Sequence, residues 1–180
     1  MKTILEQNDL VNLSNPTFLE SLGFSPNKGL LIIGSIGIGK TYALKKISKE
    51  NRKGWGSLGQ PTMYFRDSPV YEEDVTGQGI SSLCNRLGQD FLRIFKDHDL
   101  YLDDLGSEKE IVNSFGNKFD PIQEILMIRY DGRNSHKTFM TTNLGEEEFK
   151  VRYGARVYSR IQEMCDIVII RGGEDLRGRF

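Results

Sequence analysis

Residues Gly34 to Thr41 read GSIGIGKT, and this stretch decides the fold of the 180-residue chain. It follows a short apolar run at 29–33 and opens a segment at 40–50 in which Leu44 and Ile47 have helical spacing. Glycines here let backbone N–H groups converge on phosphate, and the start of a helix adds partial positive charge. The stretch therefore predicts a phosphate-binding loop between a strand and a helix.

Two residues at the end of this loop have separate expected tasks. Lys40 would reach the β- and γ-phosphates of a nucleotide, and the Thr41 hydroxyl would bind Mg²⁺. A glycine-rich turn that only joins a strand to a helix is the plainer interpretation, but here the flanking elements fit as well as the pattern. The residues expected to hold the nucleotide are Gly34, Ser35, Ile36, Gly37, Ile38, Gly39, Lys40 and Thr41.

Short apolar runs alternate with helical patterns along the rest of the chain. Further strands are expected at 62–65, 100–102, 138–141 and 167–170, and helices at 80–95, 121–130 and 146–164. Helices between short apolar strands are typical of a parallel sheet covered on both faces, with ligands at the carboxyl ends of the strands. We therefore predict an α/β fold with three layers around a five-stranded parallel sheet.

The composition is that of one globular domain, with 24 basic and 25 acidic residues and 38% hydrophobic residues. The apolar run at 29–34 is far shorter than the roughly 20 residues that cross a bilayer. The first ten residues carry Glu6 and Asp9 where a secretory signal would need an apolar core. Cys84 and Cys165 have no metal-binding or disulfide spacing. We expect a cytoplasmic protein without a membrane span.

Two carboxylates end the expected strand at 100–102. Asp103 would hold Mg²⁺ through its water shell, and Asp104 would orient and polarise the water that attacks the nucleotide. An acidic strand-to-loop turn is the alternative interpretation. Asn143 ends the next strand, where its amide could fix the γ-phosphate or the lytic water, although an Asn there also suits a helix cap or a turn.

Arg152, Arg156 and Arg160 recur every four residues in the expected helix at 146–164, so they would project from one face. Considered as a helix alone, this is a solvated stripe that pairs with the acidic residues 146–148. Beside a phosphate loop, such an arginine could instead reach the γ-phosphate bound by a neighbouring subunit and stabilise charge in the transition state.

Two stretches also match the DxxG and NKxD patterns of GTPases, at 103–106 and 117–120. Only the ten residues 107–116 separate them, too few for the helix and strand expected between those loops. We therefore interpret the matches as accidental.

The ordered set GSIGIGKT, LYLDDLG with the following GSE, FGNKFDPIQEILMIRY, KTFMTTN and RYGARVYSRIQEM resembles AAA+ ATPases of the DnaC-like helicase-loader group, and also IstB-like transposition helpers. The resemblance runs from about Lys28 to about Arg171. It implies a P-loop NTPase fold of the AAA+ type without a C-terminal lid domain. Asp103 and Asp104 match the Walker B position and Asn143 matches sensor 1. Arg160 is the first choice for the arginine finger and Arg156 the second.

The same resemblance implies a function. It implies ATP and Mg²⁺ as cofactors, slow hydrolysis to ADP and phosphate, ATP-dependent self-assembly and single-stranded DNA contact in DNA replication, with a replicative helicase or a transposase as partner. Residues 1–27 would be an N-terminal extension and 28–180 the ATPase domain. Arg177 is not assigned as a second sensor, and the acidic stretch 68–79 does not favour contact with phosphate. A transposition helper and a nucleotide-dependent interaction module with little turnover stay open as alternatives.

Overall fold

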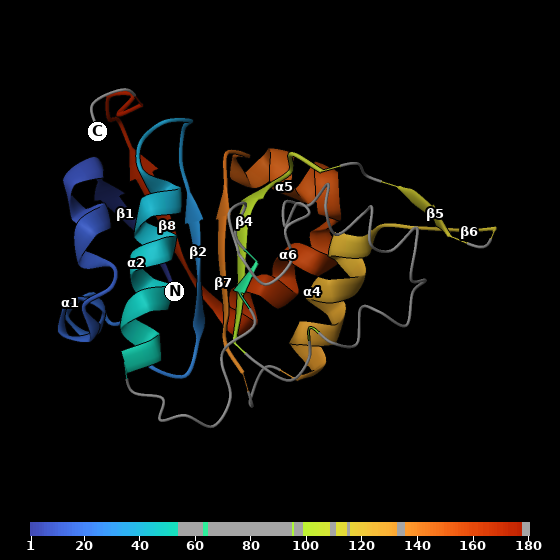
Figure 1. Cartoon of the computed structure of the whole chain (residues 1–180), viewed down its shortest axis with the longest axis horizontal. Helices are drawn as coiled ribbons and strands as arrows, with labels where there is room; N and C mark the ends of the chain where they lie inside the picture. Colours follow the sequence, from blue (N-terminus) through green and yellow to red (C-terminus); the bar gives the residue numbers. More distant parts are fainter. Residues whose placement is uncertain are drawn as a thin grey trace.

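A parallel sheet forms the centre of the molecule, and Figure 1 shows its strands side by side between helices. The computed structural model describes residues 1–53, 63–64, 95, 99–108, 111–114, 116–132 and 136–177. The sheet has six strands in the order β1-β8-β2-β7-β4-β3, and every described pairing between them is parallel. The strands are β1 (Lys2–Glu6), β2 (Gly29–Ile33), β3 (Met63–Tyr64), β4 (Leu100–Leu105), β7 (Thr138–Thr142) and β8 (Cys165–Arg171).

All five predicted strands are present, as β2, β3, β4, β7 and β8, so the predicted α/β parallel sheet is confirmed. A sixth strand, β1, was not predicted from the sequence; it pairs with β8 from Lys2 opposite Ile167 to Glu6 opposite Arg171. This strand lies at the edge of the sheet, and its residues alternate between exposed and half-buried. It therefore lacks the continuous apolar run that marks a parallel strand buried on both faces. Residues expected in an N-terminal extension thus add a strand to the sheet.

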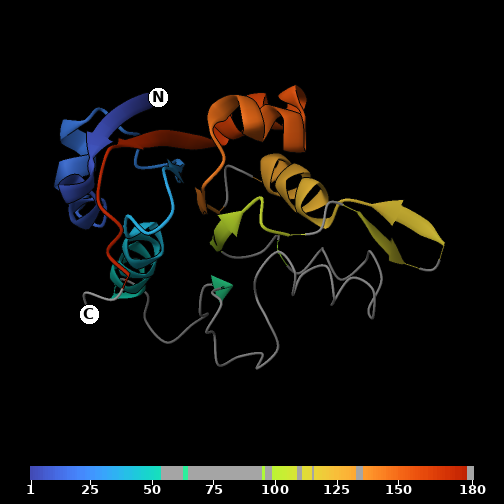
Figure 2. The same cartoon turned by 90° about the horizontal axis from the view of Figure 1, so that it is seen from above.

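Successive side chains of β2 face opposite sides of the sheet and enter two separate cores. Leu30 and Ile32 pack in the same core as Leu44 of the helix α2 (Lys40–Lys53). Leu31 and Ile33 pack in the core formed with α4 (Pro121–Asp131), α5 (Glu146–Tyr153) and α6 (Ala155–Met164). Figure 2 shows α2 on one side of the sheet and these three helices on the other. The three predicted layers are therefore present.

The N-terminal segment adds two short helices to the α2 side of the sheet, η1 (Gln7–Asn12) and α1 (Pro16–Ser21). Leu10 and Leu13 are buried in the same core as α2. Each fully buried aliphatic side chain of this kind contributes about 1.5–3 kcal/mol to folding. The segment before β2 therefore belongs to the packed body of the molecule.

The predicted single helix at 146–164 is wrong, because Gly154 divides it into α5 and α6. Gly154 has φ 89° and ψ 147°, a backbone conformation that side-chain-bearing residues avoid. Its N–H closes α5 on the carbonyl of Lys150, and its own carbonyl accepts from the N–H of Tyr158 in α6. Arg152 therefore lies on a different helix from Arg156 and Arg160, and the predicted common face does not exist.

A two-stranded antiparallel hairpin, β5 (Val112–Ser114) and β6 (Asn117–Phe119), projects from the body of the molecule in Figure 1. Asp120 follows it directly and caps α4, where its carboxylate accepts from two backbone N–H groups. This hairpin was not predicted from the sequence. The predicted helix at 80–95, apart from Phe95, and the acidic stretch 68–79 lie outside the described residues. Within the described part of the chain, no helix has the length and apolar character needed to span a membrane.

Candidate functional site

The predicted phosphate loop connects β2 to α2 at the carboxyl edge of the sheet. Gly37 and Gly39 have φ of 82° and 98°, which residues with a side chain rarely adopt. Ile38 lies between them with 1% exposure and anchors the loop in the core. The Gly34 N–H donates to the Thr142 carbonyl of β7 at 3.3 Å. The loop is therefore held to both the core and the neighbouring strand.

Lys40 folds back across this loop. Its ammonium donates to the carbonyls of Gly34 at 2.8 Å and Ser35 at 2.7 Å, and to Oδ1 of Asn143 at 2.6 Å. Burial lowers the pKa of Lys40, while the charges of Asp104 and Asp103 act in the opposite direction. A buried ammonium between neutral carbonyls and two carboxylates is well placed to meet an anionic group.

Thr41 and Asp103 meet at the start of α2. The Thr41 hydroxyl donates to Oδ2 of Asp103 at 2.8 Å, and the hydroxyl of Thr141 donates to Oδ1 of the same carboxylate at 2.5 Å. Carboxylate and hydroxyl oxygens with room for phosphate oxygens and water are what Mg²⁺ prefers. No group of three or more His, Cys, Asp or Glu side chains that could hold a metal occurs among the described residues. An ion here would thus complete its shell with nucleotide oxygens and water.

The second carboxylate, Asp104, lies in a distortion of β4. Leu102 pairs with Met140 and Leu105 with Thr142, so two residues of β4 oppose the single Thr141 of β7. Such a bulge redirects side chains at the edge of a sheet. Asp104 has φ 55°, the one positive value among the described non-glycine residues. A strained backbone of this kind persists only where its surroundings hold it, and often at functional sites.

Two polar side chains of β7 and its end hold Asp104 in this conformation. The Thr141 hydroxyl accepts from the Asp104 backbone N–H at 2.9 Å. The Asn143 amide donates to Oδ1 of Asp104 through its nitrogen, while its oxygen accepts from Lys40. Five predicted residues, Lys40, Thr41, Asp103, Asp104 and Asn143, therefore lie together. Thr141 was missed, although it stands in the same TTN stretch as Asn143.

The predicted arginine fingers lie elsewhere in the molecule. Arg160 stacks its guanidinium over the Tyr130 ring, 4.7 Å from the centroid, and contacts the sulfur of Met127 in α4. Arg156 is exposed on α6. Among the described contacts, neither guanidinium touches the cluster around Lys40. Arg177, which was not assigned as a second sensor from the sequence, pairs with Asp175 at 2.5 Å.

Two segments distant in sequence border the phosphate loop, and neither was expected there. The Leu176 N–H donates to the Gly37 carbonyl at 2.9 Å. The Gln7 side chain exchanges two hydrogen bonds with the backbone of Glu174, at 2.8 and 2.9 Å, and a third reaches the Ile38 carbonyl at 3.3 Å. Figure 2 shows the segment after β8 running to α2. We call residues 172–177 the C-terminal strap.

Arg152 has a different environment from the other two arginines. Its guanidinium pairs with Glu108 at 2.8 Å and with Asp120 at 2.5 Å, and its side chain is only 9% exposed. The alternative interpretation, a solvated stripe paired with residues 146–148, does not hold for Arg152, because these two carboxylates are its partners, while Lys150 pairs with Glu146 and Glu147.

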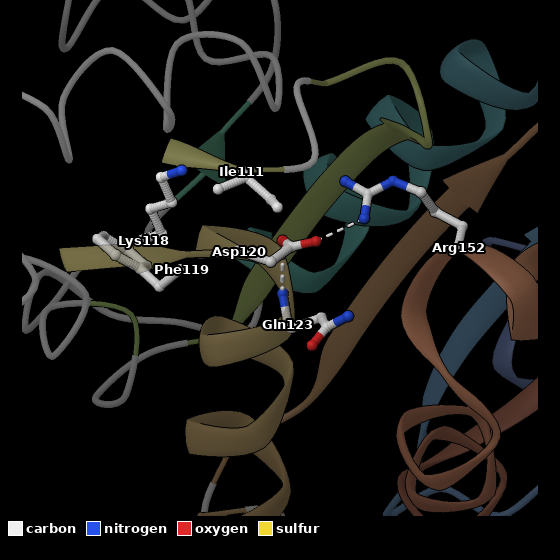
Figure 3. A pocket seen from close by; sticks show the side chains of 6 residues that line it. All are labelled: Ile111, Lys118, Phe119, Asp120, Gln123 and Arg152. Atoms are coloured by element: carbon white, nitrogen blue, oxygen red, sulfur yellow. Dashed lines mark hydrogen bonds and ion pairs between the residues drawn. The ribbon is translucent and has the colours of Figure 1, made fainter. Parts of the chain in front are cut away.

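A cavity of about 300 Å³ opens beside the Arg152–Asp120 ion pair and the hairpin, and Figure 3 shows both side chains pointing toward each other there. Its other lining residues are Ile111, Lys118, Phe119 and Gln123. The stretch 117–120 that mimics NKxD is thus strand β6 followed by a helix cap. None of the cavity residues belongs to the cluster around Lys40.

No protein-family model matches the chain. Among solved structures, the crystal structure of the DnaC helicase loader is similar, with a TM-score of 0.57 and 24% sequence identity. The match covers 88% of this chain and 90% of that one. The fold is therefore similar to that of the DnaC helicase loader. At this identity the similarity supports the three-layer architecture, whereas the activity depends on the residues of the site.

Proposed function

We propose that this chain is an ATPase of the AAA+ type that acts as a DnaC-like helicase loader in the cytoplasm. The observation that supports it best is the meeting of Lys40, Thr41, Asp103, Asp104 and Asn143 at one edge of the sheet. These residues come from the start of α2, from β4 and from the position after β7, at the carboxyl edge of the sheet where ligands bind in parallel α/β folds.

In this proposal, the triphosphate of ATP takes the place of the carbonyls that Lys40 contacts. The lysine would leave Gly34 and Ser35 and bind the β- and γ-phosphates, with loop N–H groups around them. Thr41 and Asp103 would hold Mg²⁺, which when bound neutralises charge on the phosphate oxygens. Their existing hydrogen bond keeps hydroxyl and carboxylate close together before any ion arrives.

Asp104 is the candidate general base. It would accept a hydrogen bond from the attacking water and take its proton as the oxygen bonds to the γ-phosphorus and the bond to the β-phosphate oxygen breaks. Asn143 contacts both Asp104 and Lys40, so it is placed to adjust the carboxylate to the presence of the γ-phosphate. This is the role expected of a sensor of the bound nucleotide.

The described contacts of the cluster include no arginine, so we propose that a second copy of the chain supplies one. Arg160 is the first candidate, because it follows Ser159 in the stretch RYGARVYSRI that resembles the arginine-finger box, and Arg156 on the same helix α6 is the second. Arginine at the γ-phosphate stabilises charge in the transition state and raises turnover by about 10³–10⁵-fold in related chemistry. A homo-oligomer that forms with ATP follows from this division of the site, and contact of that oligomer with single-stranded DNA and a replicative helicase is proposed on the resemblance to helicase loaders.

The test is the rate of ATP hydrolysis per subunit as a function of protein concentration, at fixed low salt, with and without single-stranded DNA. We expect the rate per subunit to rise with concentration and to rise further with DNA. Tight ATP binding with a flat rate near zero at all concentrations would contradict hydrolysis and favour a nucleotide-dependent interaction module. Stimulation by a transposase rather than a helicase would favour the transposition helper.

A further inference from the structure

A buried carboxylate lies four residues beyond Asp104. The side chain of Glu108 has 0% exposure, and each of its oxygens is bonded. Oε2 accepts from the Gly106 backbone N–H at 2.9 Å. Oε1 accepts from Arg152 at 2.8 Å and from the Tyr153 hydroxyl at 2.5 Å. Glu108 therefore connects the turn after β4 to the helix α5.

The partners of Glu108 are themselves fixed. Arg152 also pairs with Asp120, which caps α4, so three separate segments meet at one guanidinium. The same guanidinium lies 4.5 Å from the centroid of the Tyr153 ring. Burial raises the pKa of Tyr153, with the charge of Glu108 acting in the same direction, so its hydroxyl remains a donor. A buried charge with all these partners is held rigidly, whereas one without them would be costly.

This anchored group adjoins the strained residue of the candidate site. The Asp104 carbonyl accepts from the N–H of Ser107 at 3.3 Å and from its hydroxyl at 2.8 Å, which closes a tight turn. The Gly106 N–H that Glu108 binds lies within that turn. The hydrogen bonds from β7 hold one side of Asp104, and Glu108 holds the turn on its other side. Without the second support, the positive φ of Asp104 loses one of its restraints.

We propose that Glu108 is a positioning residue for ATP hydrolysis: it ties the turn after Asp104 to α5 and α4, and so sets the direction of the Asp104 carboxylate. The inference rests on the proposed ATPase function. Glu108, Arg152 and Asp120 would then affect the rate of hydrolysis although none of them contacts Lys40 among the described residues. Small displacements of a catalytic group, of about 1 Å, can reduce turnover about 100-fold.

Two variants separate positioning from stability. Glu108→Ala removes the tether but leaves Arg152 with one partner fewer, and it could fail to fold. The triple variant Glu108→Leu, Arg152→Met, Tyr153→Phe removes the charges and the hydroxyl together, a change that folded proteins often tolerate. Lys150→Ala is the matched control, because it removes a charge on the same helix that pairs with Glu146 and Glu147 and lies over the Tyr158 ring, and that has no described contact with Glu108.

Three measurements are made on each variant: turnover at saturating ATP, the Kd for ATP, and hydrogen exchange at the Gly106 amide. In the triple variant we expect turnover to fall at least about tenfold, the Kd to stay within about threefold and Gly106 exchange to accelerate at least about tenfold. Lys150→Ala should match the native chain in all three.

Different results would contradict the positioning role of Glu108 and the proposed ATPase function. Faster Gly106 exchange with unchanged turnover would overturn the positioning role, and unchanged exchange would overturn the tether itself. A native chain that binds ATP without hydrolysing it would instead contradict the proposed function, and the exchange measurement would still decide whether Glu108 restrains the turn.

Discussion

The Lys40 ammonium lies 2.6 Å from the side-chain oxygen of Asn143, a residue 103 positions later in the chain. The nitrogen of the same amide contacts Asp104. One amide therefore joins the end of the phosphate loop to the candidate base. Any anion that draws Lys40 away from Asn143 also changes the restraints on Asp104.

Lys40→Ala should weaken ATP binding at least about 100-fold, because the variant loses the only buried ammonium among the described contacts of the loop. Calorimetric titration with ATP and Mg²⁺ measures the Kd. The matched control is Lys49→Ala, an exposed lysine on the same helix, which should bind like the native chain. Equal losses in the two variants would show that general positive charge, rather than Lys40, attracts the nucleotide.

Asp104→Asn should keep ATP binding within about threefold while reducing turnover by about 10²–10⁴, since an amide cannot take the proton of the attacking water. The backbone contact to Thr141 can persist in this variant, so the strand should keep its shape. Single-turnover kinetics with labelled ATP separates the two quantities. Native-like turnover in Asp104→Asn would remove this residue from the role of base.

The affinity for ATP should fall as the pH rises toward 10.5, the ordinary pKa of lysine. Burial lowers the pKa of Lys40 in the free chain, so the ammonium begins to lose its proton below pH 10.5. A bound triphosphate favours the charged form, and binding must then take up a proton in that window. Calorimetry in two buffers of different ionisation enthalpy reports the uptake. Zero uptake throughout the alkaline range would be inconsistent with Lys40 as the phosphate ligand.

Arg160→Ala should leave ATP binding by the single subunit unchanged and remove the rise of turnover with protein concentration. Because the side chain also covers Tyr130, we expect a loss of about 0.5–1 kcal/mol in the free energy of unfolding. Arg156→Ala lacks that packing contribution and provides the comparison. If only Arg156→Ala abolishes the concentration dependence, the trans arginine is Arg156.

The Cys165 thiol should not react with a water-soluble disulfide reagent in the folded chain. Cys165 is fully buried, burial raises its pKa, and the thiol donates to the Thr138 carbonyl at 3.3 Å. Reaction requires the thiolate, so labelling should follow unfolding. A Cys84→Ser background isolates the signal, and stopped-flow absorbance with and without denaturant measures it. Rapid labelling of the native chain would place Cys165 nearer the surface than described.

The parts of the site that could be predicted from the sequence are those fixed by local patterns. An apolar run, a glycine loop and a helical segment occur together at 29–50, and the strands next to Asp103 and Asn143 follow from the same alternation, although β4 continues through Asp103 and Asp104 to Leu105. Each of these signals lies within a few residues of the group it places. The sheet topology then brings them to one edge without further information.

The missed features depend on distant partners or on the exposed side of the fold. Arg152 pairs with Glu108, which lies 44 positions earlier, and with Asp120, which lies 32 positions earlier. No local sequence pattern encodes contacts over such separations. The edge strand β1 has only alternating burial, and its partner β8 is at the far end of the sequence. Gly154 is the local signal in the sequence for the break between α5 and α6, because glycine within a helix costs about 1 kcal/mol relative to alanine.

The position of β8 between β1 and β2 has a consequence for how the chain assembles during synthesis. Strand β1 is the first strand of the sheet in chain order, yet its described partner is β8, the last one. Parallel pairing across so long a separation forms late, because closing the intervening chain has an entropic cost. The hydrogen bonds between Gln7 and Glu174 form only after that event. A nascent chain therefore completes the border of its phosphate loop only after β8 and the C-terminal strap have been synthesised.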